Sequence, residues 1–454
     1  MRRALVIIST CCSHFADKMA LLVAIGRSFA TCGNNTTYLL SGWSPCAHII
    51  RLGGDEVACL RESDRCFSEL EHATSSLCRF QATVLNEEND RLTKTWAAIE
   101  QIPAEMRQFS GYKLSDICRS SLARRFQASP TVLGRYSDEP VVRHHIDCFQ
   151  KDAIRSLLFF RRTMLDDRPD VVLHFSGRFH RDRCAMLVCQ ELRIPIVAIE
   201  SSFHQRYVYW DESGRTGSSG RIGCPRPWRI PPGAIDCLET LMVESLNQCG
   251  LTRDSLLHYR SHSPARTHSK TLLFLAQVPY DAALVEDGAD FSDQIEAVRA
   301  VSEHLSAIGP HRLIVRPHPK APELADEITK LGLRNTSTDH SSTRGLLDDL
   351  QSADCAITVC SQSGLQAAWL GKPVVVLGRA FYSDKGFTFD AHGSEETLGQ
   401  ALADALTAVP ADEVRRQACC EYLAYLHGNC MLRADTPSRG AELLEFACGK
   451  RQQC

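Results

Sequence analysis

The sequence predicts an α/β protein built from two doubly wound, Rossmann-like domains with a cleft between them. Short apolar segments alternate with helix-like segments in two separate regions of the chain, and such alternation is typical of parallel sheets covered by helices on both faces. Between the two regions, residues 213–233 are rich in Gly, Ser and Pro, which predicts a loop. In such sheets, ligands bind beyond the carboxyl ends of the strands.

The first region, residues 1–225, is the predicted N-terminal domain. A helix-like segment ends at Gly33, where glycine is a typical helix stop. Residues from about 55 to 165 have mostly helical patterns and form a predicted helical insert. Strands are predicted at 4–9, 36–41, 170–175 and 195–201, with a helix at 181–193.

A linker over 226–268 and a second Rossmann-like domain over 269–410 follow, and helices near 411–427 and 440–448 lie in a C-terminal segment, 411–454. The helix predicted at 290–309 has one apolar face and stops at Gly309. Further elements are strands at 271–277, 311–317, 354–359 and 373–378 and helices at 363–371 and 395–408.

Composition excludes several classes of protein. A formal net charge of -3 over 454 residues gives no global basic field, so nucleic acid is not an expected partner. The 21 cysteines include no C-x-x-C pair and no zinc-like array, and their apolar neighbours predict buried, reduced thiols. The first apolar run is too short for a signal peptide, and no stretch approaches the roughly 20 apolar residues of a membrane helix. We therefore expect a cytoplasmic protein.

The segment Gln277–Asp281, "QVPYD", ends a predicted buried strand with an amide and a carboxylate held around a proline. One interpretation is a simple turn, in which Pro279 fixes φ and Asp281 caps the next helix. The alternative is a carboxylate placed for chemistry at the strand end.

The segment "RPHPK" follows the next strand and holds Arg316, His318 and Lys320 at alternating positions. If the backbone stays extended, the three side chains point to one side, where three cationic groups suit a phosphate. An exposed basic turn is the alternative.

A third group, Ser361, Ser363 and Gly364, lies between a buried strand and a helix. Free backbone N–H groups and hydroxyls at a helix start form an anion site, although a serine N-cap gives the same pattern. The fourth is Glu200, which ends a strand of the first domain and would face the cleft unless it is a surface residue. The aromatic residues after it would stack on a sugar or pack internally: Phe203, Tyr207, Tyr209 and Trp210.

Together the four groups favour a nucleotide-sugar transferase. A phosphate site in one domain would stabilise the charge of the leaving group. Carboxylates facing the cleft would attack or shield the sugar cation and take the proton of the acceptor.

These segments resemble the bacterial capsule polysaccharide biosynthesis proteins, a family that includes retaining β-Kdo transferases. The resemblance rests on "QVPYD", on the His-Pro of "RPHP" and on "SQSGLQAAWLGKPVVVLGRAFYSDKGFT", and is supported by the stretch "HFSGRFHRDRCAMLVCQELRIPIVAIESSFH" followed by "DESGRTG". It covers residues 170–225 and 270–390. The motifs occur once, as in the single-site members of the family.

The resemblance implies a GT-B glycosyltransferase with a CMP-sugar donor, typically CMP-Kdo. It gives Asp281 the role of nucleophile, places His318 at the donor phosphate, and makes Glu200 the acid/base candidate on the acceptor side. Ser361 and Ser363 would hold the phosphate of CMP, and Gln277 would orient Asp281 or the donor. The family often has a lysine where Arg316 stands, and a glycine-containing turn where this chain continues from Glu200 with "ESSFH".

No cofactor or metal is expected, since CMP carries a single phosphate and no Asp-x-Asp motif follows a strand; the acidic pairs Asp166–Asp167 and Asp348–Asp349 are predicted to be solvated. The acceptor would be a glycan or lipid-linked glycan. Five arginines would lie either at an anionic membrane surface on the inner face of the membrane or on solvated helix faces: Arg119, Arg124, Arg125, Arg161 and Arg162.

Three alternatives stay open at this point. The first is a transferase of the same fold with another CMP- or UDP-sugar. The second is a non-catalytic glycan- or nucleotide-binding scaffold in capsule assembly or export. The third is a nucleotide-sugar epimerase of GT-B shape.

Overall fold

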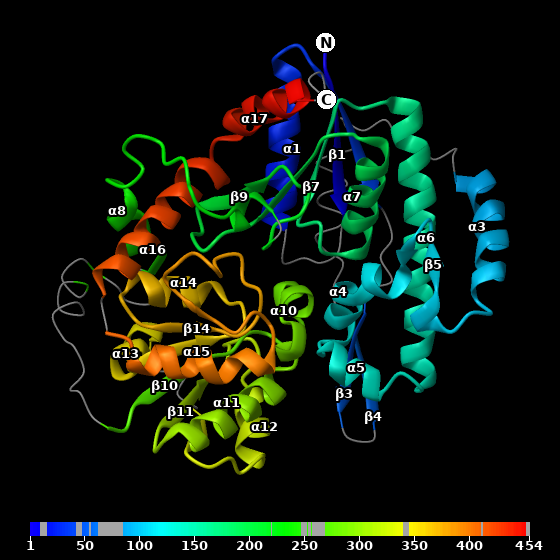
Figure 1. The fold of residues 1–454 in the computed structure, drawn as a ribbon. Coiled ribbons are helices and arrows are strands. Elements are labelled where there is room, and N and C mark those ends of the chain that lie inside the picture. The colour runs from blue at the N-terminus through cyan, green and yellow to red at the C-terminus, as the bar shows by residue number, and fades with distance from the viewer. Residues whose placement is uncertain are drawn as a thin grey trace. The chain divides into compact units, whose positions relative to one another are not determined.

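A computed structural model describes residues 1–9, 16–41, 48–53, 56–61, 85–218, 220–246, 252, 256, 268–338, 345–409 and 412–450. The chain divides into two compact units, drawn in Figure 1. Unit 1 comprises residues 1–201, 206–216 and 432–454, and unit 2 comprises residues 202–205 and 217–431. Both contain a six-stranded, mainly parallel sheet, so the predicted fold class of two Rossmann-like domains is confirmed, whereas the cleft between them stays a prediction.

The sheet of unit 1 has the strand order β16-β9-β8-β7-β1-β2. Strands β2, β1, β7 and β8 are parallel, and β9 is antiparallel to β8. Every residue of β7 is buried, as expected for a strand covered on both faces. The bounds are β1 Arg3–Ser9, β2 Asn35–Ser41, β7 Val171–Phe175, β8 Ile196–Ser201, β9 Tyr207–Asp211 and β16 Met431–Arg433.

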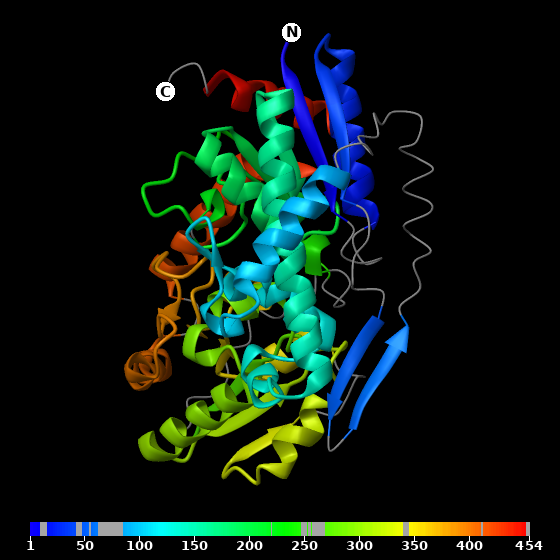
Figure 2. The ribbon, with the colours of Figure 1, turned by 90° about the vertical axis from the view of Figure 1, so that its right-hand side faces the viewer.

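Helices cover both sides of this sheet. Helix α1 packs against the C-terminal helix α17, while α4, α6 and α7 pack against one another (Figures 1 and 2). The 28-residue helix α6 contributes Phe149, Ile154 and Phe160 to a buried core that it shares with α4, α7 and β1. The bounds are α1 Ala16–Thr31, α3 Leu85–Ile99, α4 Leu114–Phe126, α5 Pro130–Arg135, α6 Pro140–Asp167, α7 His180–Leu192 and α17 Pro437–Lys450.

The predicted helical insert is helical over most of its described part, from α3 to α6. Its beginning differs from the prediction, because residues 55–61 include a strand. That strand, β4 Glu56–Arg61, pairs antiparallel with β3 His48–Gly53 in a hairpin outside the main sheet, and a smaller hairpin joins β5 Gln108–Phe109 to β6 Tyr112–Lys113.

The sheet of unit 2 has the order β12-β11-β10-β13-β14-β15, and all five neighbouring pairs are parallel. The chain therefore starts in the middle at β10, runs outward through β11 and β12, and returns to the other side of β10 at β13. This is the strand order of a dinucleotide-binding Rossmann sheet. The bounds are β10 Thr271–Leu275, β11 Arg312–Arg316, β12 Thr336–Thr338, β13 Cys355–Thr358, β14 Val374–Val376 and β15 Phe389–Asp390.

The helices of unit 2 form a layer on each side of the sheet. Helix α11 contacts α12 and α15, whereas α14 contacts α16, and Figure 1 shows α14 and α15 on opposite sides of β14. The bounds are α8 Leu238–Leu246, α10 Ala282–Asp287, α11 Gln294–Ile308, α12 Leu324–Lys330, α13 Leu346–Ser352, α14 Gln362–Trp369, α15 Glu395–Thr407 and α16 Glu413–Tyr425.

The Gly/Ser/Pro-rich segment after residue 216 is held tightly against unit 2. The hydroxyl of Tyr422 donates to the carbonyl of Ile222 at 2.5 Å, and the amine of Lys385 donates to the carbonyl of Gly223 at 2.7 Å. The indole of Trp228 lies against the rings of Tyr422 and Tyr425. The composition of this segment predicts a loop, but the loop is anchored by side chains that lie 162 and 200 residues away in the sequence.

Domain boundaries in the structure differ from those predicted. The contact pattern gives residues 217–225 to unit 2 and residues 432–454 to unit 1, where α17 packs on α1. Of the predicted linker 226–268, residues 247–251, 253–255 and 257–267 lie outside the described residues.

Most cysteines in the described part of the chain behave as small apolar residues. Cys118, Cys184, Cys189 and Cys419 are among eight that are buried, and burial raises the pKa of these four thiols. The thiolate is therefore disfavoured, which agrees with the predicted packing role. None of the described helices has both the length and the hydropathy of a membrane span.

Candidate active site

The predicted residues of unit 2 gather at the carboxyl edge of its sheet. Strands β10 and β13 are neighbours, yet the chain leaves β10 in one direction and reaches β13 from the other. Such a switch point opens a crevice outside the strand ends, where ligands bind. Gln277 and Asp281 follow β10, His318 follows the adjacent β11, and Ser361 follows β13.

Gln277 joins the two sides of the switch point. Its side chain is buried, and its Oε1 accepts a hydrogen bond from the backbone N–H of Cys360 at 3.0 Å. Its Nε2 donates to Oδ2 of Asp281 at 3.4 Å. One amide therefore ties the loop after β10 to the loop after β13 and orients the carboxylate, which is one of the two roles that the resemblance implies.

Asp281 is the N-cap of α10. Its Oδ1 accepts from the backbone N–H of Ala283 at 2.8 Å, and its backbone φ of -60° and ψ of 125° are typical of a cap. The interpretation of Asp281 as a helix cap is thus correct, and it accounts for Oδ1 but not for Oδ2. The cap occupies Oδ1, and the half-buried carboxylate also lies close enough to His318 to influence its titration.

His318 is held as a neutral ring. Its Nδ1 accepts from the backbone N–H of Lys320 at 3.0 Å, so the proton of the neutral ring resides on Nε2. Burial lowers the pKa of His318, the Asp281 carboxylate opposes the shift, and Lys320 adds to it. At neutral pH the ring can therefore offer an Nε2–H donor without a full positive charge.

The segment Arg316–Lys320 is not extended throughout, as the predicted one-sided arrangement of its three cations requires. The backbone turns at residues 319–320, and the Arg316 guanidinium forms an ion pair with the buried carboxylate of Asp349 on α13. The prediction that Asp349 is solvated is wrong, because the arginine draws it into the interior. Lys320 is exposed, and its contact with a donor, like that of Arg316, stays a prediction.

The loop after β13 forms an ordinary serine cap. Oγ of Ser361 accepts from the backbone N–H of Ser363 at 3.2 Å, and the N–H of Ser361 donates to Oγ1 of buried Thr358 at 3.1 Å. A Cβ on Gly364 would collide with the hydroxyl of Tyr382 and with Thr358, so this glycine is needed for packing. Both serines remain half-buried at the edge of the sheet, with hydroxyl protons that could donate to an anion.

Glu200 lies at the end of β8 in unit 1. Its Oε1 accepts from the backbone N–H of Ser201 at 2.9 Å, and the residue is half-buried. It belongs to the other unit, so its predicted role beside Asp281 stays a prediction. Of the aromatic residues that follow it, Tyr209 and Trp210 on β9 are buried in the core, which corrects the idea that these two stack on a sugar.

A second polar cluster, undetected in the sequence, lies under the carboxyl end of β7. Oδ2 of Asp152 is 2.7 Å from Nε2 of His180 and 2.8 Å from Nε of Arg181, and Oγ of Ser121 is 2.9 Å from Nδ1 of His180. Burial by itself would raise the pKa of Asp152, but His180 and Arg181 outweigh it and hold the pKa well below its usual range. All four side chains are buried, so the cluster fastens α4, α6 and α7 together.

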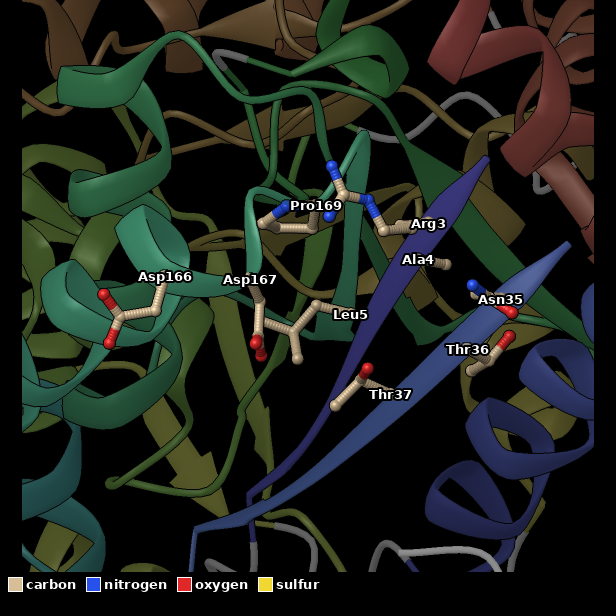
Figure 3. Close-up of a pocket in the computed structure, with 9 residues that line it drawn as sticks. All are labelled: Arg3, Ala4, Leu5, Asn35, Thr36, Thr37, Asp166, Asp167 and Pro169. Atoms are coloured by element: carbon tan, nitrogen blue, oxygen red, sulfur yellow. The ribbon is translucent and has the colours of Figure 1, made fainter. Parts of the chain in front are cut away.

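A cavity of ≈ 420 Å³ lies in unit 1 at the amino ends of β1 and β2 (Figure 3). Arg3, Thr37 and Asp167 line it together with the segment just before β7. No predicted site residue takes part, and Glu200 lies at the opposite, carboxyl end of the same sheet. Among the residues whose placement is described, no group of three or more His, Cys, Asp or Glu side chains has a metal-binding arrangement.

The arginines considered for a membrane surface are mostly paired. Arg125 is buried against His145, which corrects its assignment to a surface. Arg161 pairs with Glu191 at 3.0 Å. Two more pairs are Arg119 with Asp116 at 3.0 Å and Arg162 with Asp166 at 3.7 Å.

The fold and the strand-end groups define a two-unit α/β protein whose second unit has the layout of a nucleotide-binding sheet. The model of the family described as "Capsule polysaccharide biosynthesis protein" matches residues 239–425, a segment inside unit 2. Over this segment the chain is related to the capsule polysaccharide biosynthesis family, which confirms the resemblance for residues 270–390. The search of curated proteins finds no match.

Solved structures with a similar course include Thermosulfurimonas dismutans KpsC, a beta Kdo 2,7 transferase, at 16% identity and a TM-score of 0.35, over 61% of this chain and 85% of that one. The beta Kdo 2,4 transferase of the same KpsC matches at 18% identity and a TM-score of 0.35, over 51% of this chain and 78% of that one. Methanocaldococcus jannaschii UDP-GlcNAc 2-epimerase matches at 12% identity and a TM-score of 0.32, over 92% of this chain and 98% of that one.

Proposed function

We propose that this chain is a retaining glycosyltransferase that moves a sugar, Kdo from CMP-Kdo, to a glycan or lipid-linked glycan acceptor in capsule synthesis. The observation that carries the proposal is the carboxylate of Asp281, oriented by Gln277 and adjacent to neutral His318, at the switch point of the sheet. The family match covers the same unit.

In the first step, the Asp281 carboxylate attacks the anomeric carbon of the donor. The bond from that carbon to the phosphate oxygen breaks, CMP leaves with the electron pair, and a glycosyl ester forms on Asp281. The Nε2–H of His318 and the hydroxyls of Ser361 and Ser363 donate to the phosphate oxygens and stabilise the developing negative charge. Lys320, exposed beside His318, adds a positive charge.

In the second step, an acceptor hydroxyl attacks the same carbon. Glu200 takes the proton of that hydroxyl, and the bond to Asp281 breaks, which regenerates the carboxylate. Two displacements on opposite faces of the sugar give net retention. The proposal needs no cofactor, because the leaving group carries one phosphate, and the hydrogen-bond donors of His318, Ser361 and Ser363 stabilise its negative charge. A cytoplasmic location, with the acceptor at the inner face of the membrane, belongs to the same proposal.

The test is CMP release from CMP-Kdo with candidate acceptors. Asp281→Asn keeps a good helix cap, so its stability should match wild type while turnover falls at least a thousandfold. The matched control is Asp412→Asn at the cap of α16, where Oδ1 accepts from the N–H of Arg415 at 3.0 Å and turnover should be unchanged. Full turnover in the Asp281→Asn variant would remove the nucleophile.

Two further measurements separate the alternatives. Intact mass of the Glu200→Gln variant with CMP-Kdo should show a Kdo adduct that is absent when Asp281 is also replaced. A melting temperature raised by CMP but not by UDP supports the donor class. The reverse result rejects CMP-sugars, and CMP binding without turnover for any acceptor identifies a scaffold. Conversion of a UDP-sugar without any acceptor would identify an epimerase.

A further inference from the structure

Gln294 holds the backbone N–H and the backbone carbonyl of Gln277 with the two ends of its side-chain amide. Its Oε1 accepts from the backbone N–H of Gln277 at 2.5 Å, and its Nε2 donates to the backbone carbonyl of Gln277 at 2.6 Å. The side chain is 3% exposed and stands at the first turn of α11, after the N-cap Asp293. The amide thus pairs with the backbone as a neighbouring strand would.

This contact comes where the β-ladder ends. The last ladder bond along β10 runs from the N–H of Ala276 to the carbonyl of Arg316 at 3.0 Å, one residue before Gln277. Buried backbone groups need hydrogen-bond partners, and at Gln277 a side chain supplies both. The backbone orientation at Gln277 is therefore set by Gln294, at a point where the sheet no longer sets it.

The side chain of Gln277 transmits that orientation. Its amide reaches the N–H of Cys360 on one side and the carboxylate of Asp281 on the other. We propose that Gln294 is a positioning residue for Asp281, acting through Gln277; this inference rests on the proposed function. Loss of the clamp lets the Asp281 carboxylate drift, and a misplacement of about 1 Å can cost roughly a hundredfold in rate.

The variant Gln294→Glu tests the clamp with a pH signature. At high pH the carboxylate accepts from the N–H of Gln277 but has no proton for the Gln277 carbonyl. The protonated acid has one acceptor and one donor, like the amide, and burial raises the pKa of the new carboxyl. Relative to wild type at the same pH, kcat should fall at least tenfold at pH 8 and recover as pH falls toward 5.5. KM for CMP-Kdo should stay within about threefold, because no donor contact is removed.

Two variants complete the design. Gln294→Ala should lose kcat at every pH without recovery. Gln400→Glu, the same substitution at an exposed position of α15, should follow wild type throughout. Wild-type kcat in Gln294→Glu across the whole pH range, or a loss that does not depend on pH, would overturn the inference.

Hydrogen exchange measures the same clamp without any activity. In Gln294→Glu at pH 8, amides of residues 276–283 should exchange at least fivefold faster than in wild type at equal pH, with the ratio returning toward one at pH 5.5. If wild type shows no turnover with CMP-Kdo, the proposed function fails while this measurement still stands. Unchanged exchange over these residues would reject the clamp, whatever the protein catalyses.

Discussion

One polar cluster from each unit shows two opposite ways of placing titratable side chains. In unit 2, Asp281 and His318 are half-buried at the strand ends. Oδ1 of Asp281 and Nδ1 of His318 each accept a hydrogen bond from a backbone N–H, whereas Oδ2 of Asp281 and Nε2 of His318 are not used in these two contacts. In unit 1, Asp152, His180 and Arg181 are buried together, and Asp152 pairs with both of the other side chains. Asp281 and His318 thus stay accessible at the edge of the unit 2 sheet, whereas the buried cluster of unit 1 fastens helices together.

This difference shows why a perturbed pKa is a poor guide to chemistry on its own. The pKa of Asp152 is held well below its usual range, and burial lowers that of His174 to about 4, yet both lie inside unit 1. Structural ion-pair networks shift pKa values as strongly as active sites do. Access to solvent at a sheet's carboxyl edge separates the two cases in this molecule.

Among the tests of this comparison, the largest expected effect shows whether unit 1 takes part in the reaction at all. Glu200→Gln should slow transfer to an acceptor by about a hundredfold to ten-thousandfold, the usual range for a lost general base. CMP affinity should be unchanged, because the proposed phosphate contacts lie in unit 2. Steady-state rates and calorimetry with CMP measure the two quantities. Glu191→Gln, at an exposed position near the end of α7, is the control. A joint loss of rate and CMP affinity would contradict this division between the units.

The next effect concerns the buried histidine of unit 1. Nε2 of His174 lies 2.8 Å from the carbonyl of Gly214, and the folded state keeps the ring neutral. Its stabilising contribution is complete above the unfolded pKa near 6.5 and is lost as pH falls toward 4. A shift of that size corresponds to about 3 kcal/mol.

Urea unfolding of His174→Gln should therefore show a weaker fall in the free energy of unfolding between pH 6.5 and 4 than wild type shows. Exposed His144→Gln is the matched control and should keep the wild-type slope. An identical slope in the His174→Gln variant would assign the acid sensitivity elsewhere, for example to His180.

A smaller effect tests whether Arg316 of unit 2 has a structural role or binds the phosphate of the donor. Asp349→Asn removes the charge that Arg316 pairs with, and should destabilise the protein by about 2 kcal/mol, since the arginine is only partly screened by solvent. CMP affinity should stay within about threefold. If CMP affinity instead rises tenfold in Asp349→Asn, the Arg316 guanidinium binds the phosphate of CMP once it is no longer paired with Asp349.

The smallest effect concerns the charge state of His318. His318→Gln should weaken CMP binding about tenfold, the loss of one good hydrogen bond to a charged group. For wild type, CMP affinity should be level from pH 7 to 8.5, because the lowered pKa leaves the ring neutral across that range. Calorimetry measures both, with His304→Gln on α11 as control. Affinity that falls as pH rises through 7 would instead require an imidazolium.

Local patterns predicted four strands of each sheet, β1, β2, β7 and β8 in unit 1 and β10, β11, β13 and β14 in unit 2, but not β9, β16, β12 or β15. The segments predicted as strands near 170–175 and 271–277 are β7 and β10, and the helix predicted to stop at Gly309 is α11, whose C-cap is that glycine. Apolar runs and glycine stops act over a few residues, so the sequence shows them directly. The same logic places Gln277 and Asp281 after one strand and Ser361 after another.

Contacts between distant segments were beyond that logic. Gln294 looks like any polar residue at a helix start, and nothing nearby marks it as the partner of Gln277 seventeen residues earlier. Arg316 looks like one of three phosphate-binding cations until Asp349 is seen beside it. The helical pattern within residues 432–454 does not show which unit the segment joins. Packing against α1 assigns it to unit 1.

The amino-acid sequence by itself determined the alternating α/β elements, the turns at the strand ends and the relation to capsule polysaccharide proteins, because each depends on neighbouring residues. The tertiary structure decided the order of the strands, which puts the loops after β10 and β13 side by side, and the partners of each polar group. Hydrogen bonds and ion pairs reach only a few ångströms, so which groups meet depends on how remote segments pack.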